Sequence, residues 1–271
     1  MKGYLTKFAT KAEYSTYVAT AYDKPNVSLI AATGEVIFTD YEEPYPGEPI
    51  VFADNAVKAI CVANWGSDGE ITYGQAAAVT TFQVSDIPSA FMENTTITSF
   101  DELQYFTSQG ASTYRAFYGC TNLESVTLPA SVYQVGPQAF SGCTSLETVT
   151  IPEGLTTIYS NAFEGCTSLE TVTIPEGLTS IGNNAFEGCT SLTDVTIPST
   201  VISMGGAFQG CTSLETVTVK ATTPPGLVQA DPFFGCTALT AIYVPAESVT
   251  AYQTDQYWSN YASLIQAIPS A

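Results

Sequence analysis

The strongest constraint on the fold is a segment that repeats through the second half of the chain. The motif Phe-x-Gly-Cys occurs six times between residues 117 and 236, and successive cysteines are 23, 23, 23, 22 and 25 residues apart. A unit this short cannot bury its own apolar face, so stacked units must bury a continuous core between them. The spacing therefore predicts a solenoid of six coils.

Each coil is predicted to contribute one strand to a parallel sheet. Leu-x-x-Val-x-Ile or a close variant follows each cysteine, and residues 148–151 alternate polar and apolar as a half-buried strand does. Proline comes next in five of the six copies and ends the strand, because it has no N–H to donate; Lys220 replaces it in the fifth. Leu155, Ile158 and their equivalents are expected to point inward on the return path, and the motif phenylalanines to stack into an aromatic spine.

This unit resembles the BspA-like class of leucine-rich repeats, which residues 181–189 (IGNNAFEGC) match almost completely. The resemblance covers about half the chain and implies a curved, right-handed solenoid. It implies an adhesive or recognition role in surface or secreted proteins of bacteria, and it carries no catalytic residues to transfer. The opening residues, 1–20, show no continuous apolar core and no small-residue cleavage site, so they do not predict a signal peptide.

The segments outside the repeats suggest four parts. Residues 1–48 are predicted to form a helix, a β-hairpin and a linker, and residues 49–95 a helix–loop–helix. Residues 96–245 are predicted to be the solenoid with an N-terminal capping helix, and residues 246–271 a helical C-terminal cap. The fold class is thus α/β or mainly β, with a small α+β N-terminal domain.

Particular side chains support these boundaries. Two capping boxes, Thr10 with Glu13 and Ser99 with Glu102, predict helices through Tyr22 and over residues 100–106. At the other end, Trp258, Tyr261 and Ile265 have helical spacing and are expected to pack on the last coil.

Composition excludes several functions. Only 7 Lys and Arg face 26 Asp and Glu, and the resulting net charge of −19 repels nucleic acid and anionic membranes. Histidine is absent, which removes the commonest general base, and no apolar stretch approaches the roughly 18 residues of a membrane span. We therefore expect neither an enzyme nor a membrane-inserted protein, and no cofactor.

One loop resembles a calcium site. Residues 64–75 (NWGSDGEITYGQ) lie between two predicted helices, and an EF-hand register gives Asn64, Asp68, Glu70 and Gln75 as weak metal candidates. Position three of that register is Gly66, which has no side-chain oxygen, and position twelve is an amide instead of a bidentate glutamate. A degenerate turn without metal is the better interpretation.

Two further columns run along the predicted coils. The six motif cysteines are expected to be buried, reduced thiols, because parallel side chains suit a disulfide poorly and no C-x-x-C pair suggests zinc. Glutamates recur after the repeat leucine at Glu124, Glu147, Glu170 and Glu215. These glutamates are interpreted as a solvated face, as weak cation sites or as a surface that attracts a basic partner.

The outward residues of the strands form a hydroxyl-rich surface, called the strand face here and predicted to be concave. Its candidate binding residues are Thr127, Thr148, Thr150, Thr171, Thr173, Asp194, Thr196, Thr216, Thr218 and Tyr243. Threonine also favours strands, so β-propensity alone could explain the ladder. The leading hypothesis is a protein-binding or adhesion module whose partner is basic or a host extracellular protein; the alternative is a structural component of a phage or cell-surface assembly.

Overall fold

The computed structural model describes residues 27–29, 36–38, 46–79, 91–106, 114–227 and 231–269. The chain forms two compact units, Met1–Glu48 and Pro49–Ala271, which are described separately. In the first, β1 (Val27–Leu29) pairs antiparallel with β2 (Val36–Phe38), as the predicted hairpin requires. The helix predicted from Thr10 to Tyr22 lies outside the described residues. None of the described helices is long and apolar enough to cross a bilayer.

The second unit begins with two short helices, α2 (Asn55–Trp65) and α3 (Tyr73–Ala77). Asp54 caps α2: its buried carboxylate accepts hydrogen bonds from the N–H of Ala56 at 2.7 Å and of Thr98 at 2.6 Å. Burial alone would raise the pKa of Asp54, but these hydrogen bonds outweigh it and lower the pKa below its ordinary value of 3.8. The cap therefore joins α2 to the segment that enters the first coil.

The predicted capping box at Ser99 is wrong. Ser99 lies in β3 (Ser99–Phe100), and the following 3-10 helix η1 (Asp101–Tyr105) has no side-chain cap. Glu102 does not reach back to Ser99; its Oε1 accepts a hydrogen bond from the N–H of Ala53 at 2.8 Å. A contact between segments distant in the sequence has thus replaced the local one.

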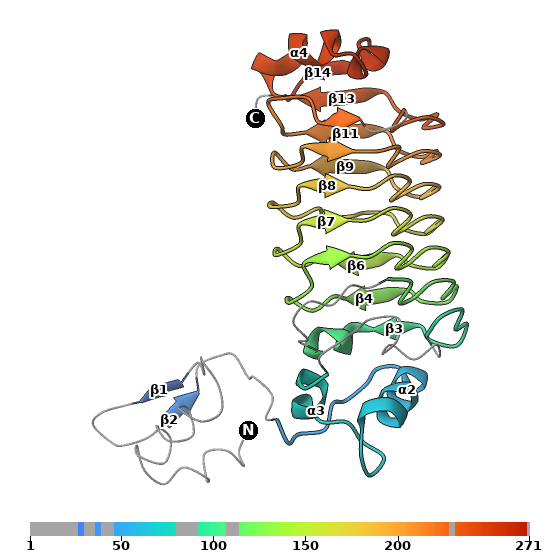
Figure 1. The fold of residues 1–271 in the computed structure, drawn as a ribbon, viewed down its shortest axis with the longest axis vertical. Helices are drawn as coiled ribbons and strands as arrows, with labels where there is room; N and C mark the ends of the chain where they lie inside the picture. Colours follow the sequence, from blue (N-terminus) through green and yellow to red (C-terminus); the bar gives the residue numbers. More distant parts are fainter. Residues whose placement is uncertain are drawn as a thin grey trace. The chain divides into compact units, whose positions relative to one another are not determined.

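The repeats form stacked coils along a nearly straight axis, so the predicted curvature of the solenoid and the concavity of its strand face are not seen in the described coils (Figure 1). One side of the coils carries two parallel sheets, ordered β3-β4-β6 and β14-β13-β11-β9. Their remaining strands are β4 (Ser125–Thr127), β6 (Thr148–Thr150), β9 (Asp194–Ile197), β11 (Thr216–Val219), β13 (Ala241–Val244) and β14 (Ile265–Ala267). The leucine-rich repeats with their parallel sheets are therefore present as the sequence predicted.

The return path of the coils forms a second parallel ladder that the sequence analysis did not identify as strands. Its members are β5 (Gln134–Val135), β7 (Thr157–Ile158), β8 (Ser180–Ile181), β10 (Ser203–Met204) and β12 (Gly226–Leu227). Two residues per strand give too little alternation to identify a strand by periodicity. The inward apolar residue of each is buried, and Ile158 is fully so.

An aromatic spine runs through the core. Rings of neighbouring coils from Phe117 to Phe208 stack with centroids 5.1–5.2 Å apart and interplanar angles of 2–8°. The next ring, Phe233, lies 6.0 Å from Phe208 and contacts Trp258 of the C-terminal segment. Because all these rings are buried, the spine links every coil to the next.

The C-terminal segment covers the last coil with mixed structure. It contains η2 (Ala246–Ser248), α4 (Val249–Thr254) and η3 (Trp258–Tyr261), followed by β14. Trp258 is buried, and its Nε1–H donates to the carbonyl of Pro225 at 2.9 Å. Ile265 does not continue a helix with Trp258 and Tyr261; it lies in β14 and pairs with Ile242, because the segment satisfies the edge of β13 with another strand.

Candidate functional site

The strand face consists of the outward side chains of β4, β6, β9, β11 and β13 together with Thr171 and Thr173. Ladder pairing places equivalent positions side by side, as in Thr127 with Thr150 and Thr196 with Thr218. Exposure is greatest in the middle, at Thr148, Thr150, Thr171, Thr173, Asp194 and Thr196. Thr127, Thr216, Thr218 and Tyr243, which lie toward the ends, are half-buried.

The threonines of the coils fall into two groups by what their hydroxyls contact. At the turn after four of the motif cysteines, the threonine hydroxyl donates to a carbonyl of the preceding coil, as Thr144 does to Thr121 at 3.3 Å and Thr167 to Thr144 at 3.1 Å. On the strand face, the structure gives no hydrogen bond to the hydroxyls of Thr148, Thr150, Thr171, Thr173, Thr196, Thr216 and Thr218 within the described residues. The turn threonines thus join coils, whereas the strand-face hydroxyls point to solvent.

The N-terminal end of the strand face is closed by Asp101 of η1. Its carboxylate accepts hydrogen bonds from the hydroxyls of Ser125 at 3.2 Å and Thr127 at 3.0 Å. Thr127 is therefore already engaged within the protein, unlike the threonines of the following coils. The free hydroxyl array begins at Thr148.

The ladder of the strand face is interrupted at residues 171–174. This segment lies between β6 and β9 but belongs to neither sheet, and the structure gives no cross-coil backbone hydrogen bond for its four residues. Val172 and Ile174 are 8% exposed, compared with 2% for Val195 and 0% for Ile197 in the next coil. Residues 144–155 and 167–178 have the same sequence, so local propensity does not explain the interruption.

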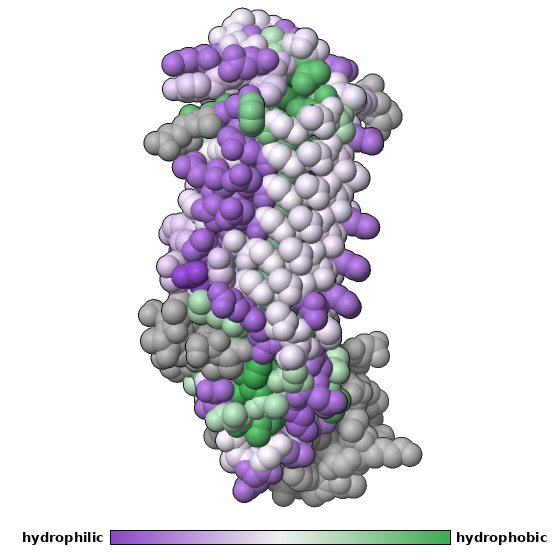
Figure 2. All heavy atoms as spheres, turned by 90° about the vertical axis from the view of Figure 1, so that its right-hand side faces the viewer, coloured by the Kyte–Doolittle hydropathy of each residue, from purple (hydrophilic) through white to green (hydrophobic). Residues whose placement is uncertain are grey.

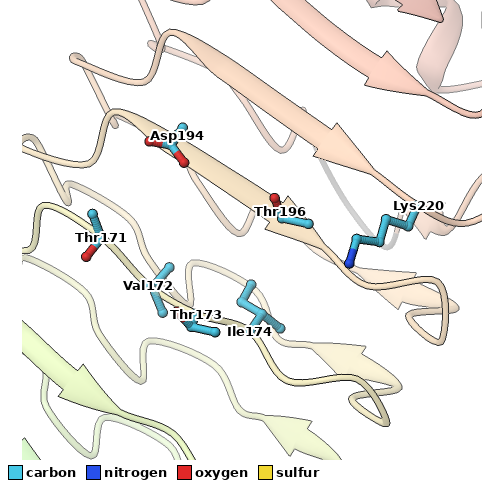
Figure 3. A pocket seen from close by; sticks show the side chains of 7 residues that line it. All are labelled: Thr171, Val172, Thr173, Ile174, Asp194, Thr196 and Lys220. Carbon is cyan, nitrogen blue, oxygen red and sulfur yellow. The ribbon is translucent and has the colours of Figure 1, made fainter. Parts of the chain in front are cut away.

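A hollow of about 350 Å³ lies at this interruption (Figure 3). Its lining combines the threonines of two coils with one acid and one base: Thr171, Val172, Thr173, Ile174, Asp194, Thr196 and Lys220. Figure 3 shows Asp194 and Lys220 at opposite ends of the hollow. In the sequence, Lys220 stands out only because it replaces the strand-ending proline, and no local pattern indicates the hollow.

Lys220 is the only lysine or arginine after residue 115. Its ammonium pairs with Glu176 at 3.0 Å, a contact that spans two coils, and both side chains are about half exposed, at 48% and 53%. An ion pair this accessible contributes little to stability, about 0–1 kcal/mol. Its main effect is to place a single cation beside the hydroxyl-rich middle of the strand face.

The acidic columns lie in solvent. Glu124, Glu147, Glu170 and Glu215 are all exposed, and no lysine or arginine occurs between residues 116 and 219. In the part of the chain that the structure describes, no group of three or more His, Cys, Asp or Glu side chains is arranged to hold a metal ion. Figure 2 shows a broad band of near-neutral side chains on one face of the coils, bordered by hydrophilic side chains.

The EF-hand-like loop is a tight turn. Ser67 and Glu70 exchange backbone hydrogen bonds of 2.8 and 2.9 Å around Asp68 and Gly69, both of which have positive φ. The amide of Gln75 accepts from the Thr72 N–H at 2.8 Å and donates to Ser67 at 3.0 Å. The side chain at the twelfth position of the register is thus used to cap α3.

The remaining candidate ligands are also placed. The Asn64 amide donates to the carbonyl of Ile60 at 2.8 Å, while Asp68 and Glu70 are exposed. Of the four weak candidates, Asn64 and Gln75 therefore make hydrogen bonds to nearby residues, and Asp68 and Glu70 lie exposed in the turn.

The cysteine column follows the predicted line with one exception. Five motif cysteines are buried, and their thiols donate to the carbonyl of a phenylalanine in the preceding coil, as Cys166 does to Phe140 at 3.2 Å. Burial raises the pKa of these thiols, to about 12 for Cys189. Cys236 departs from the prediction: it is only partly buried, because the last coil leaves this turn open to solvent.

Comparisons with solved structures find bacterial leucine-rich repeat proteins. One from Bacteroides ovatus is 34% identical over 49% of this chain and 34% of its own, with a TM-score of 0.43. The leucine-rich repeat protein of T. pallidum is 37% identical over 48% of this chain and 63% of its own, also with a TM-score of 0.43. The pneumococcal vaccine antigen PcpA is 18% identical over 64% of this chain and 42% of its own, with a TM-score of 0.50 that supports the shared fold. The chain spans less than two thirds of the length of each.

A comparison with curated proteins finds no match. The family model of the BspA type leucine rich repeat region matches residues 111–240 in six copies. These limits enclose the six Phe-x-Gly-Cys motifs, the stacked strands and the aromatic spine described above. Residues 111–240 of this chain thus match the BspA type leucine rich repeat region, over just under half of its length.

Proposed function

We propose that this protein is a non-enzymatic binding module that recognises a protein partner with its strand face. Leucine-rich repeats of this family suggest a protein-binding or surface role, and the finer assignment to adhesion at a bacterial surface or in a secreted protein is ours. The single observation that carries the proposal is the set of strand-face hydroxyls, from Thr148 to Thr218, to which the structure gives no partner within the described residues. Unengaged hydroxyls in register can donate to and accept from a partner without breaking a bond inside the coils.

The chemistry of the strand face determines the kind of binding. Its middle is rich in hydroxyls and carries one charge, Asp194, so burial of apolar area can contribute little to affinity there. Neighbouring strands lie about 4.8 Å apart, so hydroxyls are presented repeatedly along the coils, with Asp194 replacing one of them. Such a surface suits modest affinity for a repetitive target, whose many sites raise the avidity. We expect a host extracellular-matrix protein.

Charge favours a basic partner. The net charge of −19 and the exposed glutamate columns beside the repeats attract cationic surfaces over a distance set by the ionic strength. Association with a basic matrix protein should therefore slow as salt rises, while a neutral partner should show little change.

The decisive experiment places cations on the strand face. The triple variant Thr150→Arg, Thr173→Arg and Thr196→Arg alters exposed positions in three successive coils. Binding to immobilised extracellular-matrix proteins is measured by surface plasmon resonance, and we expect it to weaken by about tenfold or more, which corresponds to roughly 1.4 kcal/mol.

A matched control keeps the charge change the same on the return side. Thr156→Arg, Thr179→Arg and Ile202→Arg alter exposed residues just before the return strands and also add three positive charges. Binding by this control should weaken much less than binding by the first variant, because only the long-range attraction changes. Equal weakening in both variants would show that net charge, and not the strand face, determines binding. Binding that survives the first variant would contradict the proposal.

A further inference from the structure

We propose that the hollow beside residues 171–174 binds an extended segment of the protein partner that carries a basic side chain and, two residues along, an acidic one. The basic group pairs with Asp194 and the acidic group with Lys220, at the two ends of the hollow (Figure 3). This inference rests on the proposed function, because it takes the occupant from the partner that the strand face recognises. It adds which coils anchor that partner and which side chains the partner must present.

Both charges of the hollow are departures from the repeat. Four of the six coils read Leu-Glu-Thr-Val or Leu-Glu-Ser-Val at this point, whereas residues 192–195 read Leu-Thr-Asp-Val. Because successive side chains of a strand point to opposite faces, moving the acid by one residue transfers it from the acidic column to the strand face. In the next coil, Lys220 replaces the proline that follows the strand in the other five copies. Two changes in neighbouring coils thus line one hollow.

The separation of the two charges sets the length of the occupant. Asp194 begins β9, and the Lys220 N–H donates to the carbonyl of Ile197, at the end of β9, at 3.0 Å. Three to four residues of strand separate these levels, which is about 10–13 Å. A free amino acid carries both charges on a single residue and is too short to reach both ends.

An extended segment has the required length. Its side chains at positions i and i+2 point to the same side and lie about 6.6 Å apart, and a long basic side chain covers the remaining distance. The hollow of about 350 Å³ is at the lower end of the roughly 300–1,000 Å³ of ligand pockets, so it holds two side chains and the residue between them.

Asp194 is free to accept a cation. It is exposed and is the only charged side chain of the strand face. The Thr193 hydroxyl donates to its Oδ2 at 3.2 Å, and the structure gives its Oδ1 no hydrogen bond within the described residues. A carboxylate has about four acceptor positions, so it can bind two N–H groups of a guanidinium and keep the bond from Thr193. Arginine is therefore the basic residue that fits best.

Lys220 can bind a carboxylate without leaving its present partner. Its ammonium has three donors, and Glu176 Oε1 accepts one of them at 3.0 Å. Lys220 lines the hollow, whereas Glu176 is not among its lining residues. The ammonium can thus donate to Glu176 and to an acidic side chain of the partner at the same time.

The backbone at the interruption favours a peptide over a small ion. Residues 171–174 all line the hollow, and within the described residues their N–H and C=O groups make no hydrogen bond to a neighbouring coil. Unpaired backbone groups bond either to water or to groups that a ligand brings. An extended segment supplies its own N–H and C=O groups beside its two charged side chains.

The test titrates the full-length, 15N-labelled chain with the peptide acetyl-Ala-Arg-Ala-Asp-Ala-amide at low ionic strength and follows the amide signals by NMR. We expect the largest shifts at residues 171–174 and 194–197, with a dissociation constant of about 1 mM or below. The control peptide acetyl-Ala-Ala-Arg-Asp-Ala-amide has the same composition, but its charged side chains point to opposite sides. It should bind about tenfold more weakly.

Substitutions then separate the contributions of the two charges. Asp194→Asn and Lys220→Gln should each weaken binding of the first peptide by about tenfold, because each removes a charged hydrogen-bond partner. Glu147→Gln and Lys58→Gln change the net charge equally outside the hollow and should bind as the wild type does, since the peptide is neutral overall. Glu176→Gln breaks the same ion pair as Lys220→Gln but keeps the ammonium, so it should bind at least as tightly as the wild type.

Several outcomes would overturn the inference. They are the absence of shifts at the hollow, equal binding of the two peptides, wild-type binding by Asp194→Asn or Lys220→Gln, and equal weakening in Glu176→Gln and Lys220→Gln. The shifts in the wild type locate the site even if a variant does not fold. Failure of the proposed function is seen separately, as binding to matrix proteins that survives the strand-face triple variant.

Discussion

The aromatic spine should determine whether the coils unfold together. Phe163 is fully buried and stacks on Phe140 and Phe186, with both centroid distances at 5.1 Å and angles of 3° and 5°. Phe163→Ala removes the ring and leaves a cavity, and substitutions of this kind cost about 3–5 kcal/mol. Phe163→Leu keeps most of the apolar volume but loses two ring contacts, each worth roughly 0.5–1.5 kcal/mol, so it should cost about 1–3 kcal/mol.

The two tryptophans provide the assay. Trp65 lies in α2 and Trp258 in η3, so their fluorescence reports opposite ends of the second unit during urea denaturation. In a repeat protein each coil is stabilised by its neighbours, so weakening a central coil reduces coupling between the ends. When each tryptophan is followed alone in the Phe163→Ala background, the urea midpoints reported by Trp65 and Trp258 should therefore be separated. In the otherwise wild-type chain, the same two midpoints should lie closer together.

Tyr133→Ala is the control for the loss of an aromatic ring, because Tyr133 is 44% exposed; it should change stability by less than about 0.5 kcal/mol. The reasoning is refuted if Phe163→Ala costs no more than this control. A loss in Phe163→Leu equal to that in Phe163→Ala would show that stacking, and not cavity formation, accounts for the whole effect.

Three further predictions concern other parts of the unit. The amides of residues 171–174 should exchange hydrogen faster than those of residues 148–150 in peptide-resolved exchange, because only the latter belong to a ladder; equal rates would contradict the interruption. Because the folded pKa of Asp54 lies below 3.8, its contribution to stability is present above that pH and is lost as pH falls through the folded value. The destabilisation caused by Asp54→Asn should consequently shrink in acid when denaturation is followed from neutral pH downward, and a constant difference would refute this. Trp258→Phe should cost about 1–3 kcal/mol by leaving the buried carbonyl of Pro225 without its donor, with thermal unfolding as the measurement and an unchanged melting temperature as the contrary result.

The repeat was predictable because its signals agree at every level. Period-two alternation, strand-ending prolines and a fixed spacing of phenylalanine and cysteine all indicate one coil, and a single coil determines its neighbours. The aromatic spine followed directly, because equivalent residues in register must meet. The short return strands, such as β7 at Thr157–Ile158, lay below the length at which alternation is informative.

The sequence failed where a contact depends on another segment. Glu102 forms its hydrogen bond with Ala53 and not with Ser99, and no local pattern contains that information. Thr144 and Thr148 are the same residue type in one repeat, yet the hydroxyl of Thr144 joins two coils and that of Thr148 faces solvent. The partial exposure of Cys236 likewise depends on how the last coil is covered.

The near-identity of two coils has a consequence for how such a chain can change in length. Residues 144–155 repeat at 167–178, and the phenylalanines, cysteines and turn threonines of these coils contact equivalent partners. Deleting residues 144–166 would join Cys143 to Thr167 and continue into the same twelve residues, TSLETVTIPEGL. An in-frame deletion or duplication of these 23 residues would therefore remove or add one whole coil. The extent of the strand face can thus change in steps of one coil without requiring a new contact between coils.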